Sequence, residues 1–483
     1  SDLEGLVSVQ ITRNDVVGLA HPAIDAHTLG IMSLAGLLSD CGIRCEIADP
    51  EVCRLFDRPE MPVHMAGIRR WIVSRGITVL GVSYRLDPDD GVRIVRNLAG
   101  SLSRGRIFAR DGGPVRHLLF AGLPETCRRV QKHVRDVSAV FDGGETPAGT
   151  LRRLGIAAGV LPRSVAEGLG YDDARMEFGR EVIRKADYTG VKPVDRSGCP
   201  GFGTRSDTLA ARVSHGTERR LPPLMRAHAG PYLPDRMAAV HLFLDWTKRL
   251  AAGGLLDVLS IGTSQLSQSN FGEEWGDRPN GGGVPINSPD EFGLVWQAAR
   301  PMLVRTYAGT SRIPDLARMY EEQINIAWHA LSLWWFCQMD GRGPLTLREN
   351  LRQQVETLRY AGMSGKPYEP NVSHHFGFRG ADDVTSVVAA VLAARTAKRA
   401  GVRYLVLQVM LNTPVGTWGV QDLAKARAML GLVRELEDDR FRVFLQPRAG
   451  LALFPPSPEE AKVRLAATTV LMDDIEPCDE TSP

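Results

Sequence analysis

The residues Asp25, His27 and Gly30 form the pattern D-x-H-x-x-G, at a place where a turn from strand to helix is expected. An imidazole on such a turn can leave the sheet edge and ligate a metal. The carboxylate two residues earlier can accept the other ring N–H, which fixes the tautomer. Gly30 allows a tight turn or the close approach of a bulky group. The alternative is a turn histidine that is simply satisfied by a neighbouring aspartate.

Polar and basic residues also follow the apolar runs in the second half of the chain. Three arginines, Arg226, Arg305 and Arg448, stand at such positions, with His228 and Tyr307 close by in sequence. Arginines that meet at one site suit the bidentate binding of a substrate carboxylate or phosphate. The alternative is that each arginine caps a helix or pairs with an acid. The other polar residues at these positions are Thr263, Ser264, Gln265, Gln408, Asn412 and Gln446.

Composition narrows the class of protein. A chain of 483 residues suggests two or three domains. A net charge of +2 with mixed signs argues against nucleic acid or a membrane surface as the main partner. The seven cysteines include no C-x-x-C pair and no trio spaced for an iron–sulfur cluster, so we expect reduced thiols. Without a leader-like start or an apolar run of membrane length, we expect a cytoplasmic protein that acts on a small molecule, with a homodimer left open.

Residues 1–155 alternate between strand and helix patterns. The continuously apolar run Ile77–Tyr84 is typical of a central parallel strand covered on both faces. Five such units predict an α/β fold with a doubly wound, flavodoxin-like sheet that binds ligands at the carboxyl ends of its strands, where a flavin or a nucleotide would also fit. The predicted strands are Leu6–Thr12, Arg44–Ala48, Ile77–Tyr84, His117–Ala121 and Val137–Phe141. The predicted helices are Thr28–Cys41, Val63–Ser74, Gly91–Leu102, Glu125–Val134 and Thr146–Leu154.

The chain beyond residue 155 divides into a linker and a second domain. Residues 156–222 lose the periodicity and predict a linker, with a solvent-facing helix at Asp172–Ala186. Residues 223–483 repeat strand and helix patterns, which predicts a TIM-barrel-like (β/α) domain or, alternatively, helices over an open sheet. The predicted strands are Leu224–Ala229, Asp257–Thr263, Pro301–Tyr307, Tyr404–Leu411 and Arg442–Gln446. The predicted helices are Pro234–Ala252, Pro289–Ala299, Pro314–Trp335, Leu347–Gly362, Asp383–Arg399, Val420–Glu437 and Pro458–Val470.

Residues 1–155 resemble the cobalamin-binding domain of cobalamin-dependent mutases and methionine synthase. In that family the D-x-H-x-x-G histidine is the lower axial ligand of cobalt. The resemblance therefore implies that His27 ligates the metal, that Asp25 orients it and that Gly30 allows close approach. Ser83 matches the serine of the family's S-x-L motif, whereas Arg85 stands where the family has leucine. By the same resemblance, the nucleotide tail of the cofactor is held by Ala121, Gly122, Gly143, Gly144 and Thr146.

Residues 223–483 resemble, more distantly, the catalytic barrel of glutamate mutase (methylaspartate mutase). Arg305 resembles one of that family's three substrate-binding arginines, whereas His228 and Tyr368 stand where the family has the other two. Glu369 with the following proline matches an E-P pair, and Ser386 stands where the family has a catalytic glutamate. These replacements argue against glutamate as the substrate. The residues that we place in the catalytic site are Arg226, His228, Arg305 and Tyr368.

The two resemblances together imply an adenosylcobalamin-dependent radical mutase, or a rearrangement enzyme derived from one, that acts on a small polar acid. Such an enzyme is an isomerase. Arg305 is the best candidate to hold the acid. Two alternatives stay open at this point. One is a methylcobalamin-dependent methyltransferase, for which the sequence offers no recognisable methyl-donor site. The other is a cobalamin-binding sensor or carrier whose barrel has lost catalysis, which the replaced residues would favour.

Overall fold

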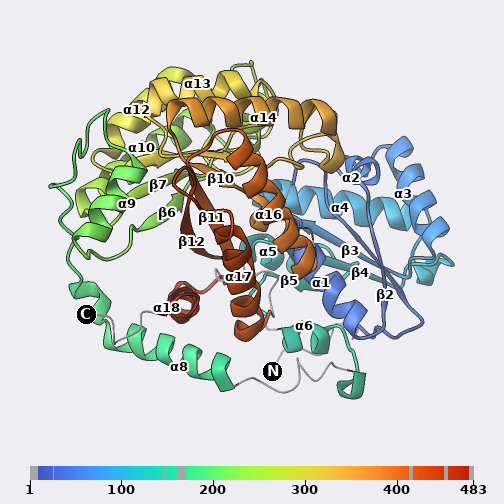
Figure 1. The fold of residues 1–483 in the computed structure, drawn as a ribbon. Helices are drawn as coiled ribbons and strands as arrows, with labels where there is room; N and C mark the ends of the chain where they lie inside the picture. Colours follow the sequence, from blue (N-terminus) through green and yellow to red (C-terminus); the bar gives the residue numbers. More distant parts are fainter. Residues whose placement is uncertain are drawn as a thin grey trace.

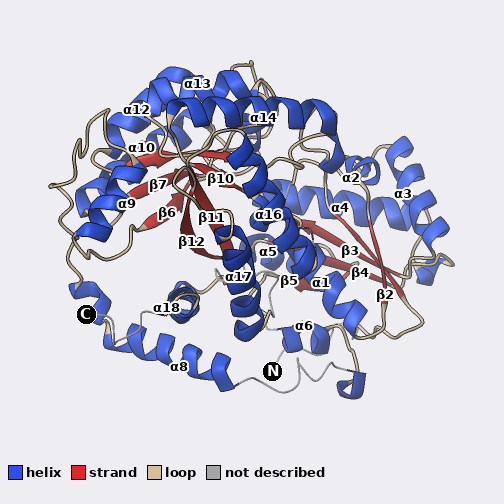
Figure 2. Cartoon of the chain, viewed as in Figure 1, coloured by secondary structure: helices blue, strands red, loops and turns tan. Residues whose placement is uncertain are grey.

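The computed structural model describes residues 9–25, 27–145, 147–160, 170–377, 379, 381–412, 417–450 and 455–477. It shows an α/β protein in which two groups of parallel strands are flanked by helices, as the sequence predicts (Figures 1 and 2). In Figure 1 the N-terminal group is blue to cyan and the second group runs from green to red. None of the helices in these ranges is both long enough and apolar enough to cross a membrane.

The first group is a five-stranded parallel sheet in the order β2-β1-β3-β4-β5. This is the order of a doubly wound, flavodoxin-like sheet. Its strands are β1 (Val16–Ala20), β2 (Arg44–Ile47), β3 (Val79–Tyr84), β4 (His117–Gly122) and β5 (Val137–Phe141). Its helices are α1 (Leu29–Asp40), α2 (Pro50–Leu55), α3 (Pro62–Arg75), α4 (Pro88–Arg104), α5 (Pro124–His133) and α6 (Pro147–Arg153). All residues of β1 and β3 are buried, because helices cover both faces.

The first strand differs from the prediction of Leu6–Thr12. The chain turns between Thr12 and Asp15, whose carboxylate accepts the backbone N–H of Thr12 at 2.9 Å, and enters the sheet only at β1. Val9 and Ile11 are nevertheless buried, because they pack against Leu154 beside the sheet. An apolar segment that packs beside a sheet can alternate between apolar and polar residues as a strand does. The sequence pattern therefore did not distinguish this segment from a strand. The D-x-H turn still follows the first strand.

The second group contains seven described parallel strands in sequential order. The strands are β6 (Arg226–Ala229), β7 (Val258–Ile261), β8 (Leu303–Arg305), β9 (His329–Leu331), β10 (Tyr368–Pro370), β11 (Tyr404–Leu411) and β12 (Arg442–Ala449). Ladders join β6-β7-β8 and β9-β10-β11-β12, and a bridge between Tyr307 and Ala330 links the two sets. Within the described ranges, no ladder joins β12 to β6. We call this curved sheet and its helices the barrel, and the carboxyl ends of its strands the mouth.

The barrel helices lie outside the strands (Figure 1). They are α10 (Arg236–Gly253), α11 (Gln265–Ser269), α12 (Pro289–Ala299), α13 (Ile313–Ile324), α14 (Leu347–Ser364), α15 (Val372–Gly377), α16 (Asp383–Arg399), α17 (Gly419–Arg434) and α18 (Pro458–Asp474). The predicted helix Pro314–Trp335 is wrong in its second half, which contains β9. The helix ends at Asn325, whose φ is 44°, and the following buried residues enter the sheet.

In its described residues, the segment predicted as a linker contains two α-helices that pack on the barrel, α8 (Gly170–Lys185) and α9 (Leu209–Glu218). Helix α8 is not the solvent-facing helix that its polar sequence predicts. Its Gly179 lies so close to α18 that a Cβ there would be 2.4 Å from the Val463 carbonyl oxygen. On α9, Arg212 forms a 2.6 Å ion pair with Asp207, and both side chains are buried. This segment is therefore an integral part of the second half.

Candidate functional site

The carboxyl ends of the two sheets face each other. In the loop after β7, a Cβ on Gly282 would lie 3.2 Å from Cδ2 of Leu86, which follows β3. In the loop after β5, a Cβ on Gly144 would lie 3.3 Å from Cδ of Pro456, which follows β12. Ligands of parallel α/β sheets and of barrels bind at these ends. The fold therefore brings two ligand-binding edges together.

His27 lies at this junction and is held by Asp25. The Nδ1 atom of His27 is 2.7 Å from Oδ1 of Asp25, which also accepts the His27 backbone N–H at 3.0 Å. The other carboxylate oxygen accepts the backbone N–H of Arg85 at 2.6 Å. Asp25 is fully buried, whereas the His27 side chain is 45 % exposed. Burial alone would raise the pKa of Asp25, but these hydrogen bonds and the His27 ring lower it.

The hydrogen bond to Asp25 leaves Nε2 as the His27 nitrogen that points away from the aspartate. Gly282 approaches this side of the ring, where a Cβ would lie 4.0 Å from Cε1 of His27. Gly30 has open space where a side chain would be, since no atom lies within 4 Å of its Cβ position. Arg85, which replaces a family leucine, contributes its backbone N–H to the Asp25 pair. The sequence motif alone gave no signal for that contact.

The other predicted cofactor residues lie at the same sheet edge. Ser83 is buried near the end of β3 and pairs in register with Ala121 of β4. Gly122 follows, and a Cβ there would lie 2.7 Å from the Phe120 ring, so the close packing requires glycine. In the loop after β5, acidic side chains accept hydrogen bonds from the backbone of the same loop. Gly143 donates to Glu145 and Gly144 donates to Asp142, both at 3.0 Å. The predicted residue Thr146 lies outside the described residues.

Inside the barrel, Glu369 is the centre of a hydrogen-bonded network. Its Oε2 accepts Nη2 of Arg305 at 2.9 Å and also the indole N–H of Trp328. Its Oε1 accepts Nε2 of Gln408 at 2.7 Å. Arg305 and Glu369 are both fully buried. Burial would raise the pKa of Glu369, but Arg305 and Arg226 outweigh it and lower that pKa, so the carboxylate is charged at neutral pH.

Arg226 extends this network across the barrel. Its Nε donates to the Ser260 hydroxyl at 2.6 Å and its Nη1 to Oε1 of Gln446 at 2.8 Å. Burial and the charge of Arg305 lower the pKa of Arg226 to about 9. Side chains from seven strands or their ends thus converge. We call this set the interior cluster: Arg226, His228, Ser260, Arg305, Tyr307, Trp328, Glu369, Gln408, Gln446 and Arg448.

Two further members of the interior cluster, His228 and Tyr307, carry titratable groups. The His228 and Tyr307 rings lie 5.8 Å apart, and the Arg305 guanidinium lies 4.2 Å from the centre of the Tyr307 ring. Burial would raise the pKa of Tyr307, but Arg448 and Arg305 outweigh it and lower that pKa to about 8. Burial and Arg448 hold the pKa of His228 well below its usual value. His228 is nevertheless exposed, so it borders an open space inside the barrel.

Tyr368 is not part of the interior cluster, in contrast to its predicted catalytic place. Successive residues of a strand point to opposite faces, and it is Glu369 that points inward. Tyr368 packs in the apolar layer between the strands and α16, beside Ala390 and Ala393. Tyr368 was assigned to the site only because it stands where the resembled family has a substrate-binding arginine, and a three-residue strand shows no alternation that would favour Glu369 instead. Trp328 and Gln408 were likewise not predicted to contact a charged centre.

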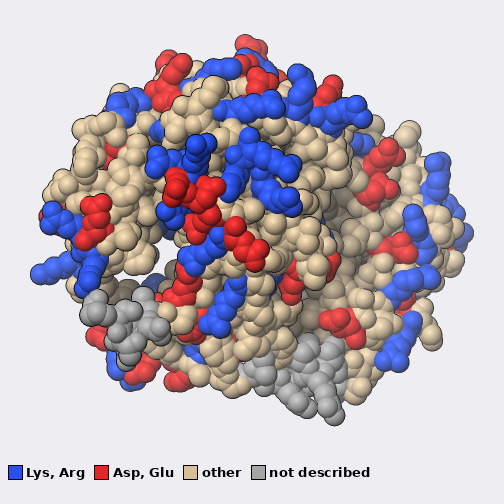
Figure 3. Space-filling view, in the orientation of Figure 1, with Lys and Arg blue, Asp and Glu red and all other residues tan. Residues whose placement is uncertain are grey.

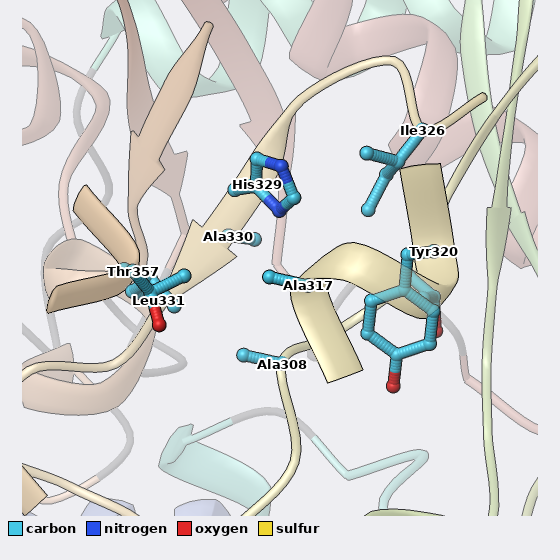
Figure 4. Close-up of a pocket in the computed structure, with 9 residues that line it drawn as sticks. Ala308, Ala317, Tyr320, Ile326, His329, Ala330, Leu331 and Thr357 are labelled. Atoms are coloured by element: carbon cyan, nitrogen blue, oxygen red, sulfur yellow. The ribbon is translucent and has the colours of Figure 1, made fainter. Parts of the chain in front are cut away.

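The cavity in Figure 4 lies outside the interior cluster, where β9 meets α13 and α14. Its volume is about 10 Å³, which is room for about one water molecule. His329, on its wall, is 2.8 Å from Oε1 of Glu321, and Lys366 is 3.2 Å from the other carboxylate oxygen. These paired and buried groups hold α13 on the sheet. We therefore assign the cavity no ligand.

The comparisons with known proteins identify no family. No family model matches the chain, and no curated protein matches it. Among solved structures, it is similar to the cobalamin-dependent S-adenosylmethionine radical enzyme OxsB with aqua-cobalamin and S-adenosylmethionine bound, at a TM-score of 0.22 and 11% identity over 97% of this chain and 57% of that chain. The apo, selenomethionine-labelled OxsB gives 0.20 and 10%, over 88% and 55%. The chain thus spans little more than half of OxsB, and scores this low carry no conclusion.

Proposed function

We propose that this chain is a cobalamin-dependent enzyme in which His27 ligates cobalt and the interior cluster binds a small acid. The observation that carries the proposal is the position of the Asp25–His27 pair, at a sheet edge that faces the mouth of an arginine-lined barrel. Gly282, in the loop after β7, lies beside the His27 ring, where a Cβ would be 4.0 Å from Cε1. The two edges therefore meet at His27.

The residues at the sheet edge fit this cofactor. Within the described ranges, no three His, Cys, Asp or Glu side chains are grouped to hold a metal ion by themselves. Cobalamin would bring most of its own metal ligands, and His27 would supply the ligand from the protein, because Asp25 accepts the Nδ1 hydrogen and thereby leaves Nε2 as the ligating atom. The side-chain-free position of Gly282 lies beside the ring, where a Cβ would be 4.0 Å from Cε1, and no atom lies within 4 Å of the Cβ position of Gly30.

Each half would have its own task in the reaction. Cobalamin would supply a cobalt–carbon bond, which can break to give a carbon radical or can donate a methyl group. Asp25 would fix the orientation of the His27 ring. Arg305 and Arg226 would hold the acid by charge-assisted hydrogen bonds, and the facing edges would exclude water from the space between them. His228, which burial and the neighbouring guanidiniums keep neutral, would face the acid as an uncharged ring.

Among cobalamin enzymes we propose an adenosylcobalamin-dependent isomerase of the mutase type. Two features support this choice over a carrier or sensor. Both halves of the sequence resemble mutases, and the barrel retains several buried charged groups, whose desolvation costs several kcal/mol each. A protein that only carried cobalamin would have no use for such groups. Figure 3 shows acidic and basic side chains interspersed on the outer face, in contrast to the predominantly cationic interior.

The first test is an absorbance titration of the purified protein with adenosylcobalamin. We expect binding with the spectral shift of histidine ligation. Asp25→Asn should weaken the affinity by about 10–100-fold, the usual effect of losing the partner of a ligating histidine. His27→Ala should abolish the shift. His133→Ala is the control. It removes an exposed histidine at the carboxyl end of α5 and should leave both the affinity and the spectral shift unchanged. No binding, or equal binding by His27→Ala, would refute the cobalamin proposal.

A second measurement addresses the reaction. A mutase exchanges hydrogen between substrate and the deoxyadenosyl group, so tritium placed in that group should appear in a substrate acid. Methyl transfer from methylcobalamin without such exchange would identify a methyltransferase instead. If neither occurs with a protein that binds cobalamin at His27, the cofactor assignment would stand and the isomerase assignment would fail.

A further inference from the structure

A groove lies between helices α10 and α12 on the outside of the barrel, where the two helices pack side by side (Figure 1). Its volume is about 460 Å³, within the range of about 300–1,000 Å³ that is typical of small-ligand sites. Because α10 ends shortly before β7 and α12 ends shortly before β8, the groove lies toward the amino ends of these strands, away from the mouth. It is therefore separate from the interior cluster and from His27.

Most of the residues that line the groove are apolar. Leu294 is 48 % exposed, although its side chain is large and apolar. A hollowed apolar surface can contact a hydrocarbon chain on more than one side, which removes more apolar area from water than a flat surface does. The apolar residues that line the groove are Leu244, Ala251, Ala252, Leu294 and Ala298. The groove is thus suited to an apolar chain.

Two cations, Lys248 and Arg300, line the same groove. Lys248 is exposed, whereas Arg300 is half-buried and its guanidinium lies 4.8 Å from the centre of the Trp296 ring. Nε and Nη1 of Arg300 are buried and have no acceptor among the described residues. Burial lowers the pKa of Arg300 to about 10, against the opposing charge of Asp207, so the guanidinium is still positive at neutral pH. Asp207 itself is paired with Arg212.

We propose that this groove binds the anion of a medium-chain fatty acid, with its hydrocarbon chain along the apolar residues and its carboxylate at Lys248 and Arg300. Nη2 is the guanidinium nitrogen that such a carboxylate would reach, since Nε and Nη1 are covered. A charge-assisted hydrogen bond at Nη2 would balance the half-buried charge. The site is independent of the proposed function, because it needs neither cobalamin nor the interior cluster.

The length of the groove favours a single chain over a docked helix. Its lining residues on α10 extend from Leu244 to Ala252, which is about 12 Å along the helix axis. An extended chain of about ten carbons has a similar length, whereas a helix of four turns would extend about 20 Å.

Isothermal titration calorimetry of the full chain with decanoate, below its micelle concentration, tests the proposal with matched probes. Butyrate has the same head group on a short chain, and decyltrimethylammonium has the same chain with a positive head group. We expect decanoate to saturate one site and to bind at least about tenfold more tightly than either probe. Butyrate buries less apolar area, and the ammonium is repelled by Lys248 and Arg300. No binding of decanoate, or equal binding of decyltrimethylammonium, would overturn the proposal.

A pair of surface variants locates the binding. Ala252→Glu places a negative charge in the groove and should lower the affinity for decanoate by about tenfold or more, because it repels the carboxylate and fills space. Ala238→Glu is the matched control, since Ala238 is also exposed on α10 but lies in the first turn, at the other end of the helix. It should bind decanoate like the wild type. Equal affinities in the two variants would place the fatty acid elsewhere and overturn the proposal.

A second pair of variants tests the role of the charge at Arg300. Arg300→Gln should weaken decanoate binding by about tenfold or more, because it removes the half-buried positive charge. Arg300→Lys keeps a positive charge and should retain most of the affinity. An equal loss in both variants would show that the packing of Arg300 on Trp296, and not its charge, supports binding. That result would overturn the assignment of a carboxylate.

Discussion

Glu369 is the single residue on which the interior cluster most depends. Its carboxylate accepts hydrogen bonds from Arg305, Trp328 and Gln408, and it is fully buried. Removing one partner of a buried ion pair leaves an uncompensated charge, which typically costs about 3–5 kcal/mol. We expect Glu369→Ala to lower the free energy of unfolding in urea by that amount. Glu177→Ala, which removes an exposed surface pair with Arg180, should cost less than about 1 kcal/mol.

The same residue predicts part of the pH dependence. The pKa of Glu369 is lowered in the folded protein, because Arg305 and Arg226 outweigh the effect of burial. Its charge therefore stabilises the fold at pH values above 4.5, the ordinary pKa, and this contribution is lost as the pH falls through the folded-state pKa. The difference in unfolding free energy between wild type and Glu369→Gln should be largest near pH 7 and should shrink in acid. A constant difference would contradict this account.

At the scale of elements, long regular segments were predictable, as were the short strands β2 and β5, whereas β9 and β10 were not. The strand Tyr404–Leu411 and the helix Asp383–Arg399 have their predicted ends, because a full buried strand and a capped helix carry complete signals. The strands β9 and β10 have three residues each, too few for an alternation to appear. Tyr368 was assigned to the site from a resemblance, and so short a strand offers no alternation that points to Glu369 instead. The buried contacts of Trp328 depend on strands far apart in sequence and had no local signal.

The polar composition of helix α8 gave no sign that it packs against α18. This packing leads to a prediction about the two helices. A Cβ on Gly179 would lie 2.4 Å from the Val463 carbonyl oxygen and 3.2 Å from the Ala467 Cβ. Gly179→Ala should force α8 and α18 apart and destabilise the protein by about 1–3 kcal/mol. Gly170→Ala is the matched control, since no atom lies within 4 Å of its Cβ position. The control should be neutral or stabilising, because alanine favours helix by about 1 kcal/mol. Thermal unfolding distinguishes the two, and equal effects would contradict the packing described.

At the scale of the whole molecule, the arrangement of the two halves decides whether there is one site or two. The first sheet supplies the Asp25–His27 pair, and the barrel supplies the interior cluster. The loop after β7 reaches between them, and its Gly282 has a φ of 77° with a Cβ position 3.2 Å from Leu86 and 4.0 Å from the His27 ring. If cobalamin binds in this junction, a side chain at Gly282 must occupy part of its space.

We therefore expect Gly282→Val to weaken adenosylcobalamin binding by about tenfold or more, because even a small misfit at a ligand site costs several kcal/mol when it cannot relax. Gly272→Val is the control. Its φ of 82° imposes the same backbone strain, but no atom lies within 4 Å of its Cβ position. If both variants bind cobalamin like the wild type, the cofactor does not lie between the halves, and the two edges would have to act as separate sites.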